Sequence, residues 1–199
     1  MGQGPRYRVM LRRRRQQRTD YRMRKAMITS KTPRLVVRGT LAHMNLQIAK
    51  ALLIGDKMLA SENSKSLVSY GWKAPSGNIP AAYLTGYLLG KKALAAGLKE
   101  AILDVGLKST TTGARLFAAL KGVVDAGLVV PHDKDILPLD QRIKGEHIAQ
   151  YAAKIRELDS AMYDKRYSQY LSKGLRPEDL PEHFTGIKAA IDQAFKEGS

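Results

Sequence analysis

The spacing of apolar residues between positions 34 and 130 restricts the possible folds of this chain more than any other feature. Five short segments have the β-branched composition or the alternation of strands: 34–38, 45–50, 57–61, 101–105 and 128–130. Two further segments have apolar residues at helical spacing: 79–96 and 113–126. Three closely spaced strands followed by alternating helices and strands predict an α/β fold. In such a fold an antiparallel meander continues into a mixed sheet, strand–helix–strand–helix–strand, with helices on its faces.

Both predicted helices carry recognisable signals. Asn78 is a suitable N-cap with Pro80 in the first turn, and Gly97 can end that helix. In the second helix, the apolar spacing turns Phe117 toward the sheet. Arg115 lies about 200° from it around the helix axis, so it should face solvent or RNA.

Positive charge is concentrated near the N-terminus. The formal net charge is +16, and residues 1–38 hold 13 arginines and lysines against a single acid, Asp20. Residues 139–199 hold ten basic and ten acidic residues. This distribution indicates a polyanionic partner, nucleic acid first and an anionic membrane surface second.

Residues 1–33 are predicted to form a basic arm. Glycines and a proline disfavour regular structure at its start, whereas residues 12–25 can form a helix if RNA or the domain supports it. Tyr7 and Tyr21 are interleaved with the arginines. Arginine pairs with phosphates and stacks on bases, and tyrosine stacks on unpaired bases. Because the sequence has no helix-turn-helix, zinc-finger or zipper pattern, the arm indicates RNA rather than DNA.

The chain therefore divides into three parts: a basic RNA-binding arm at 1–33, an α/β core domain at 34–138 and a helical C-terminal extension at 139–199. Helices are predicted at 143–158 and 184–196 of the extension. A polar loop at 64–75 contains the only tryptophan, Trp72. Stacking on a base and burial in the domain are both open for this side chain.

Other function classes have weak signals. The absence of cysteine excludes disulfides, thiol nucleophiles and Cys-ligated metals, and the four histidines show no ligand spacing, so neither a metal nor another cofactor is expected. An enzyme acting on RNA is one alternative, but no clustered carboxylates or activated nucleophile stand out. A membrane-surface protein is another, but the arm lacks a broad apolar face, a secretory h-region and any spanning segment.

Several blocks of the sequence are characteristic when taken in order. The blocks are RLVVR at 34–38, HMNLQI at 43–48, LDVGL at 103–107, GARLFAALKGVVDAG at 113–127, VPH at 130–132 and RIKGEHI at 142–148. The first two resemble the opening strands of the universal ribosomal protein family that binds 5S rRNA, family eighteen of the large subunit. The others resemble its archaeal and eukaryotic branch, and the length of the chain is similar to that of archaeal members.

This resemblance implies a ribonuclease-H-like core and a structural role without catalysis. Such a protein would attach 5S rRNA to the large-subunit rRNA in the central protuberance of the cytoplasmic ribosome, beside neighbouring ribosomal proteins. It would not involve a membrane. The resemblance places the arm and the first strands against 5S rRNA. The residues predicted to bind rRNA are Arg6, Tyr7, Arg8, Arg12, Arg13, Arg14, Arg15, Arg18, Tyr21, Arg22, Arg24, Lys25, Arg34, Arg38, Asn45 and Gln47. For Asn45 and Gln47, an ordinary exposed strand face is the competing interpretation.

Overall fold

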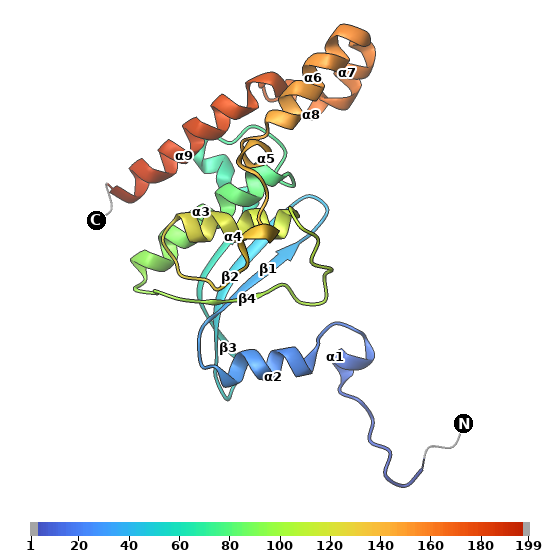
Figure 1. Ribbon diagram of the computed structural model, residues 1–199, viewed down its shortest axis with the longest axis vertical. Coiled ribbons are helices and arrows are strands. Elements are labelled where there is room, and N and C mark those ends of the chain that lie inside the picture. The colour runs from blue at the N-terminus through green and yellow to red at the C-terminus, as the bar shows by residue number, and fades with distance from the viewer. Residues whose placement is uncertain (1–3, 197–199) are drawn as a thin grey trace.

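A four-stranded mixed sheet lies at the centre of the molecule in the computed structural model, which describes residues 4–196 (Figure 1). Its strands are β1 (Arg34–Gly39), β2 (Met44–Ala51), β3 (Asp56–Asn63) and β4 (Ile102–Asp104), in the order β3-β2-β1-β4. The pairs β1–β2 and β2–β3 are antiparallel, and β4 is parallel to β1. The predicted meander and mixed α/β sheet are thus confirmed. The ends of the predicted arm and extension, at 1–3 and 197–199, lie outside the described residues.

The strand expected at 128–130 is reduced to a single parallel bridge between Glu100 and Val129. Gly127 adopts a left-handed conformation just before this bridge, and Pro131, which lacks an N–H donor, follows it. Regular pairing therefore has no room to extend on either side.

Two helices, α3 (Ile79–Ala95) and α4 (Arg115–Asp125), cover one face of the sheet. The side chain of Asn78 accepts a hydrogen bond of 2.8 Å from the N–H of Ala81, which confirms the predicted N-cap. The two helices approach closely because Gly86 of α3 and Gly122 of α4 face the partner backbone. A Cβ atom at either position would overlap a carbonyl oxygen of the other helix.

The inner and outer faces of α4 differ in part from the prediction. Phe117 is buried against the core, as expected. The Arg115 side chain is half-buried, and it donates to the carbonyl oxygens of Gly77, at 2.6 Å, and Thr40, at 3.3 Å. The helical spacing placed this arginine away from the sheet, but two loops from other elements come round to meet it.

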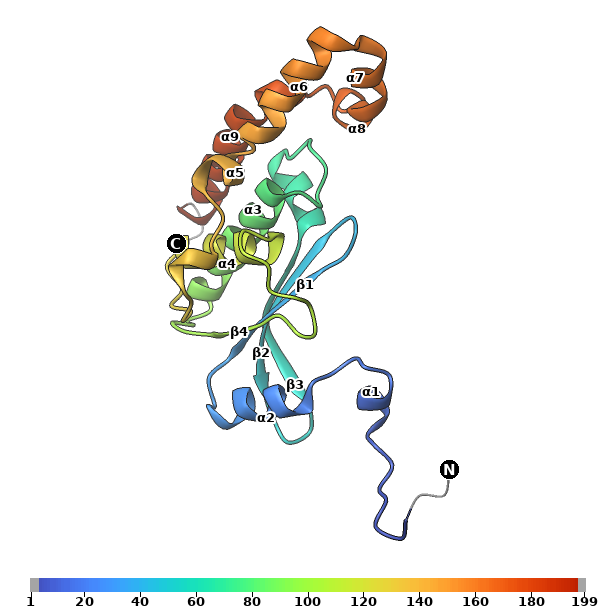
Figure 2. The same cartoon turned by 45° about the vertical axis from the view of Figure 1, so that its right-hand side comes forward.

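The C-terminal extension consists of several helices and packs against the side of α3 that α4 does not cover (Figure 2). They are α5 (Asp140–Lys144), α6 (Glu146–Leu158), α7 (Ser160–Arg166), α8 (Ser168–Leu171) and α9 (Leu180–Lys196), with a short 3-10 helix η3 (Pro177–Asp179). A second short 3-10 helix, η2 (Lys134–Ile136), precedes the extension. Because α3 is covered by α4 on one side and α9 on the other, nearly every residue from 80 to 90 is buried. One hydrophobic core therefore joins the sheet to the extension.

The segment expected as a polar loop at 64–75 contains a 3-10 helix, η1 (Ser64–Tyr70). Trp72 follows it and is only 2% exposed, with its ring stacked on that of His183 from α9 at a centroid distance of 5.2 Å. The base-stacking interpretation of Trp72 is therefore wrong, and the burial interpretation is confirmed.

The N-terminal arm lies at the end of the sheet opposite the extension in both views (Figures 1 and 2). It contains α1 (Arg12–Arg15) and α2 (Tyr21–Thr29) instead of one continuous helix from 12 to 25. Gln17 has a φ of 48°, and the Asp20 carboxylate accepts hydrogen bonds from the N–H groups of Arg22 and Met23. A left-handed residue followed by an N-cap separates the two helices.

Candidate nucleic-acid interface

The basic side chains of the arm are exposed and, for the most part, have no acidic partner. Helix α1 consists of four arginines and buries none of them, and no residue of α2 is buried. Within residues 4–196, no ion pair is found for these predicted rRNA-binding residues: Arg6, Arg8, Arg12, Arg13, Arg14, Arg15, Arg18, Arg22 and Lys25. The fold leaves this charge uncompensated, so it remains available to a polyanion.

A chain of ion pairs attaches the arm to the sheet. Arg24 of α2 contacts the Asp56 carboxylate at 2.9 Å, and the same carboxylate lies 2.7 Å from the Arg34 guanidinium. Arg34 in turn contacts Asp104 at 3.0 Å, and Asp104 contacts Arg38 at 2.8 Å. Two carboxylates are thus shared by three arginines from α2 and β1.

The arginine in the middle of this network of ion pairs is buried, whereas the arginine at its end is exposed. The Arg34 side chain is 3% exposed, and both ends of its guanidinium are occupied by carboxylates. The Arg38 side chain is 41% exposed. Burial raises the pKa of Asp56, but the hydrogen bonds and charges of Arg34 and Arg24 outweigh it and hold that pKa below its ordinary value. Asp56 is therefore ionised at neutral pH and fixes the arginines around it.

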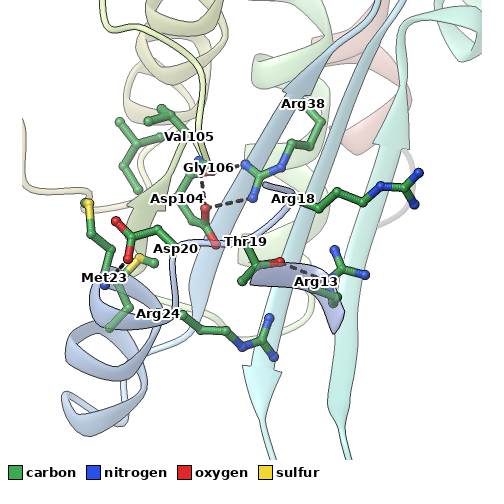
Figure 3. Close-up of a pocket in the computed structure, with 12 residues that line it drawn as sticks. Arg13, Arg18, Thr19, Asp20, Met23, Arg24, Arg38, Asp104, Val105 and Gly106 are labelled. Atoms are coloured by element: carbon green, nitrogen blue, oxygen red, sulfur yellow. Dashed lines mark hydrogen bonds and ion pairs between the residues drawn. The ribbon is translucent and has the colours of Figure 1, made fainter. Parts of the chain in front are cut away.

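A cavity of about 130 Å³ lies between the arm and the edge of the sheet (Figure 3). Arg13, Arg18, Arg24 and Arg38 line it together with Asp20 and Asp104. Both acids are already engaged, one as the N-cap of α2 and the other in ion pairs. The net character of the cavity is therefore cationic, and it has room for several water molecules or a small anionic group.

The face of the sheet turned away from α3 and α4 is polar. Leu35, Val37, Leu46 and Ile48 point to the helices and are buried. The opposite face carries residues that are in register across three strands, and they form the rows Arg38–Asn45–Asn63 and Val36–Gln47–Ser61. The side chains of both rows are half-buried or exposed. The polar face predicted for the second strand therefore exists.

The predicted rRNA-binding residues lie around the cavity, on the open face of the sheet and along the arm, and one of them, Arg34, lies inside the protein. Arg13, Arg18, Arg24 and Arg38 meet around the cavity. Asn45 and Gln47 lie on the open face of the sheet, where the Asn45 side chain accepts a hydrogen bond from Asn63.

The remaining predicted residues lie along the arm, except for one. Arg6, Tyr7 and Arg8 belong to the segment before α1, and Tyr7 is half-exposed there. Arg34 is an internal residue of the ion-pair network: both of its terminal nitrogens are paired with carboxylates, and its Nε is buried.

Sequence reasoning missed Asp56 and Asp104 as residues of this site. In the sequence, Asp56 follows Gly55 in a pair typical of turns, and Asp104 stands near the end of the strand predicted at 101–105, so neither is marked as a site residue. Acids next to a strongly basic segment are a usable signal, because buried arginines in a sheet require carboxylate partners.

The described residues form neither a metal site nor a helix that could span a membrane. Within the described residues, no three histidine or acidic side chains gather in the manner of a metal site. No described helix is long and apolar enough to cross a membrane. The open, basic and polar surfaces thus match a nucleic-acid interface best.

Comparison with known proteins gives full-length relatives. The family described as ribosomal large subunit proteins 60S L5, and 50S L18, matches residues 5–99 and 95–133. The large ribosomal subunit protein uL18 of Aeropyrum pernix is 47% identical over 197 residues, which cover 98% of this chain and 92% of the relative. The protein of the same name from Methanothermobacter thermautotrophicus is 51% identical over 193 residues, which cover 97% and 99%.

Proposed function

Since the chain belongs to the family of ribosomal large-subunit proteins 60S L5 and 50S L18, we propose that it binds 5S rRNA through its basic arm and the open sheet face. In this proposal it helps to attach 5S rRNA to the large-subunit rRNA in the central protuberance of the cytoplasmic ribosome. Family membership itself makes the chain a structural, non-catalytic component of the large ribosomal subunit, of the archaeal form. The expectations of a ribosomal protein and of no enzymatic activity are thereby confirmed.

The uncompensated charge of the arm is the observation that carries the proposal. Arginine side chains that the fold leaves unpaired repel one another, and RNA phosphates relieve that repulsion. The arm projects away from the sheet (Figure 1). Its cavity, in contrast, is lined in part by residues of the sheet edge, Leu103 and Asp104. A protein of this shape can contact two RNA segments at once, as attachment of one rRNA to another requires.

The contact surface that we propose is smaller than the predicted residue set. It comprises the unpaired arginines of the arm, Arg38 at the rim of the cavity and Gln47 on the sheet. Arg34 is left out because both ends of its guanidinium are held by carboxylates inside the protein. Its role in the proposal is to support the surface from beneath.

The direct test is a titration of 5S rRNA with the full chain at increasing salt concentration. Neutralisation of six or more phosphates predicts a loss of affinity of about a thousandfold between 50 and 200 mM salt. An unrelated structured RNA of the same length serves as the competitor. Equal binding of both RNAs, or an affinity that hardly changes with salt, would contradict the proposal.

A charge-matched pair of variants locates the surface. Conversion of the α1 arginines, Arg12–Arg15, to glutamine should reduce the slope of log K against log salt by roughly three to four units if all four contact phosphates. The control carries four glutamines in the extension, at exposed positions that lose the same charge: Lys154, Lys165, Lys173 and Lys196. Equal losses in both variants would show that total charge, and not the arm, governs binding.

A further inference from the structure

The turn between β2 and β3 is built from residues that the fold does not require there. Leu52 and Gly55 exchange backbone hydrogen bonds of 3.0 and 3.2 Å, which leaves Leu53 and Ile54 as the two central residues of a tight hairpin. Such positions normally hold glycine, asparagine or aspartate. Leu53 and Ile54 are instead large, apolar and fully exposed. Residues that break a local rule without a folding benefit indicate a functional surface.

The apolar tip continues onto the arm. Leu52 and Ile28 of α2 are also exposed, and a groove of about 490 Å³ runs between the tip and α2. Its lining is mostly aliphatic, and its one acid, Asp56, is neutralised by the arginines beside it. A contiguous exposed apolar surface of this kind marks an interaction site.

Positive charge surrounds the tip. Lys50 of β2 and Lys57 of β3 are directly opposite each other in the register of the hairpin, and both are exposed. Lys31 lines a second, neighbouring hollow together with Lys50 and Ile28. Like charges that face each other across two strands destabilise a hairpin, so this pairing also lacks a folding benefit. An acidic partner would remove the repulsion.

We propose that the hairpin tip, residues 52–55 with Ile28, docks into an apolar pocket with an acidic rim on a neighbouring protein of the large subunit. The aliphatic side chains fill the pocket, and the three lysines meet the acidic rim. RNA fits less well, because aliphatic side chains neither stack on bases as rings do nor form hydrogen bonds with base edges. A second copy of the chain is disfavoured, because each copy carries a net charge of +16 and would bring lysines against lysines.

The absence of cysteine from the chain makes a specific test possible. Leu53→Cys introduces a unique thiol, to which a benzophenone maleimide is attached before the full-length protein is assembled into large subunits. Irradiation should join it to one protein, through a peptide that contains both aliphatic and acidic residues. Val129→Cys, at an exposed site distant in sequence, is the control and should not yield that product. Cross-linking to rRNA, to a second copy or to nothing would overturn the proposal.

A charge reversal separates docking from stability. Lys57→Glu replaces a repulsive cross-strand pair by an attractive one, so the free protein should unfold at a slightly higher denaturant concentration. In the particle, the same change should reduce the yield of the Leu53→Cys cross-link about fivefold or more, because a negative charge then faces an acidic rim. Lys57→Arg should retain the yield. An unchanged yield with Lys57→Glu would overturn the acidic-rim assignment.

Binding of 5S rRNA by the free Leu53→Cys protein is measured in parallel. The proposed docking surface needs only ribosomal membership, so it can fail while 5S rRNA binding stands. Conversely, loss of 5S rRNA binding with an intact protein cross-link would leave the docking surface in place.

Discussion

Among the described residues, Asp56 is the carboxylate that attaches α2 to the sheet, and Asp56→Asn tests what that attachment does. The substitution removes the charge that accepts hydrogen bonds from Arg24, at 2.9 and 3.1 Å, and from Arg34, at 2.7 Å. A hydrogen bond to a charged group contributes about 1.5–3 kcal/mol, and partial exposure of Asp56 favours the lower half of that range. We expect the free energy of unfolding to fall by about 2 kcal/mol.

We expect Asp56→Asn to weaken RNA binding, although the change in net charge alone would strengthen it. Removing an acid raises the net charge, which alone would tighten binding. However, α2 buries no residue, so its position depends largely on the Arg24–Asp56 pair. An exposed pair contributes at most about 1 kcal/mol, so we expect about fivefold weaker binding to 5S rRNA.

The assay compares Asp56→Asn with Asp164→Asn at one salt concentration. Asp164 is exposed on α7, far along the chain from the arm, and its loss raises the net charge by the same amount. Chemical denaturation of both proteins checks that each is folded during the titration. If Asp56→Asn binds 5S rRNA as tightly as Asp164→Asn or more tightly, the pair does not position the arm and this reasoning is refuted.

Four further substitutions test the packing and the attachment of the extension. Phe117→Ala should lower the free energy of unfolding by about 3–5 kcal/mol in chemical denaturation, because its side chain is buried. Gly86→Ala should destabilise by about 1–3 kcal/mol because its Cβ meets the α4 backbone, whereas Gly186→Ala, with open space at its Cβ, should stabilise by roughly 0.5–1 kcal/mol. Burial, and then the charge of a nearby lysine, lower the pKa of His183, so its contribution to stability is present above its ordinary value of 6.5 and is lost as pH falls below it. His183→Gln should therefore flatten the decline in stability measured between about pH 7 and pH 5, and His147, whose pKa burial also lowers, accounts for what remains.

The elements that the sequence predicted well are those whose signals are local. The β-branched composition at 34–38, the strand alternation at 45–50 and the N-cap at Asn78 each depend on neighbouring residues and survive in the structure. In the observed register of β1 and β2, Leu35 lies opposite Ile48 on the core face, and a slip of one residue would turn such apolar side chains to the open face. Local patterns were enough for the core because the core is built from contiguous segments.

The features that were missed involve residues distant in the chain. Arg115 meets Gly77 and Thr40, and Trp72 meets His183, across separations that no periodicity encodes. The helical spacing of α4 described its relation to the sheet correctly, but not the loops that return to its other side. A side chain that points away from the sheet, such as that of Arg115, can therefore still be covered by other parts of the protein.

The candidate site was predicted only in part, because it too depends on contacts between residues that are distant in the chain. Arginine density identifies the arm, because residues 1–33, with 11 arginines and lysines and one acid, cannot neutralise themselves. Density cannot separate Arg34 from Arg38. Both lie in β1 and contact Asp104, but only Arg34 also contacts Asp56, and only Arg34 is buried. Asp56 is the first residue of β3 and lies opposite Ala51, close to Arg34, so the fold decides which arginine is internal and which remains at the surface. A basic residue in such a chain is best assigned to RNA only after the acids that the sheet brings to it have been counted.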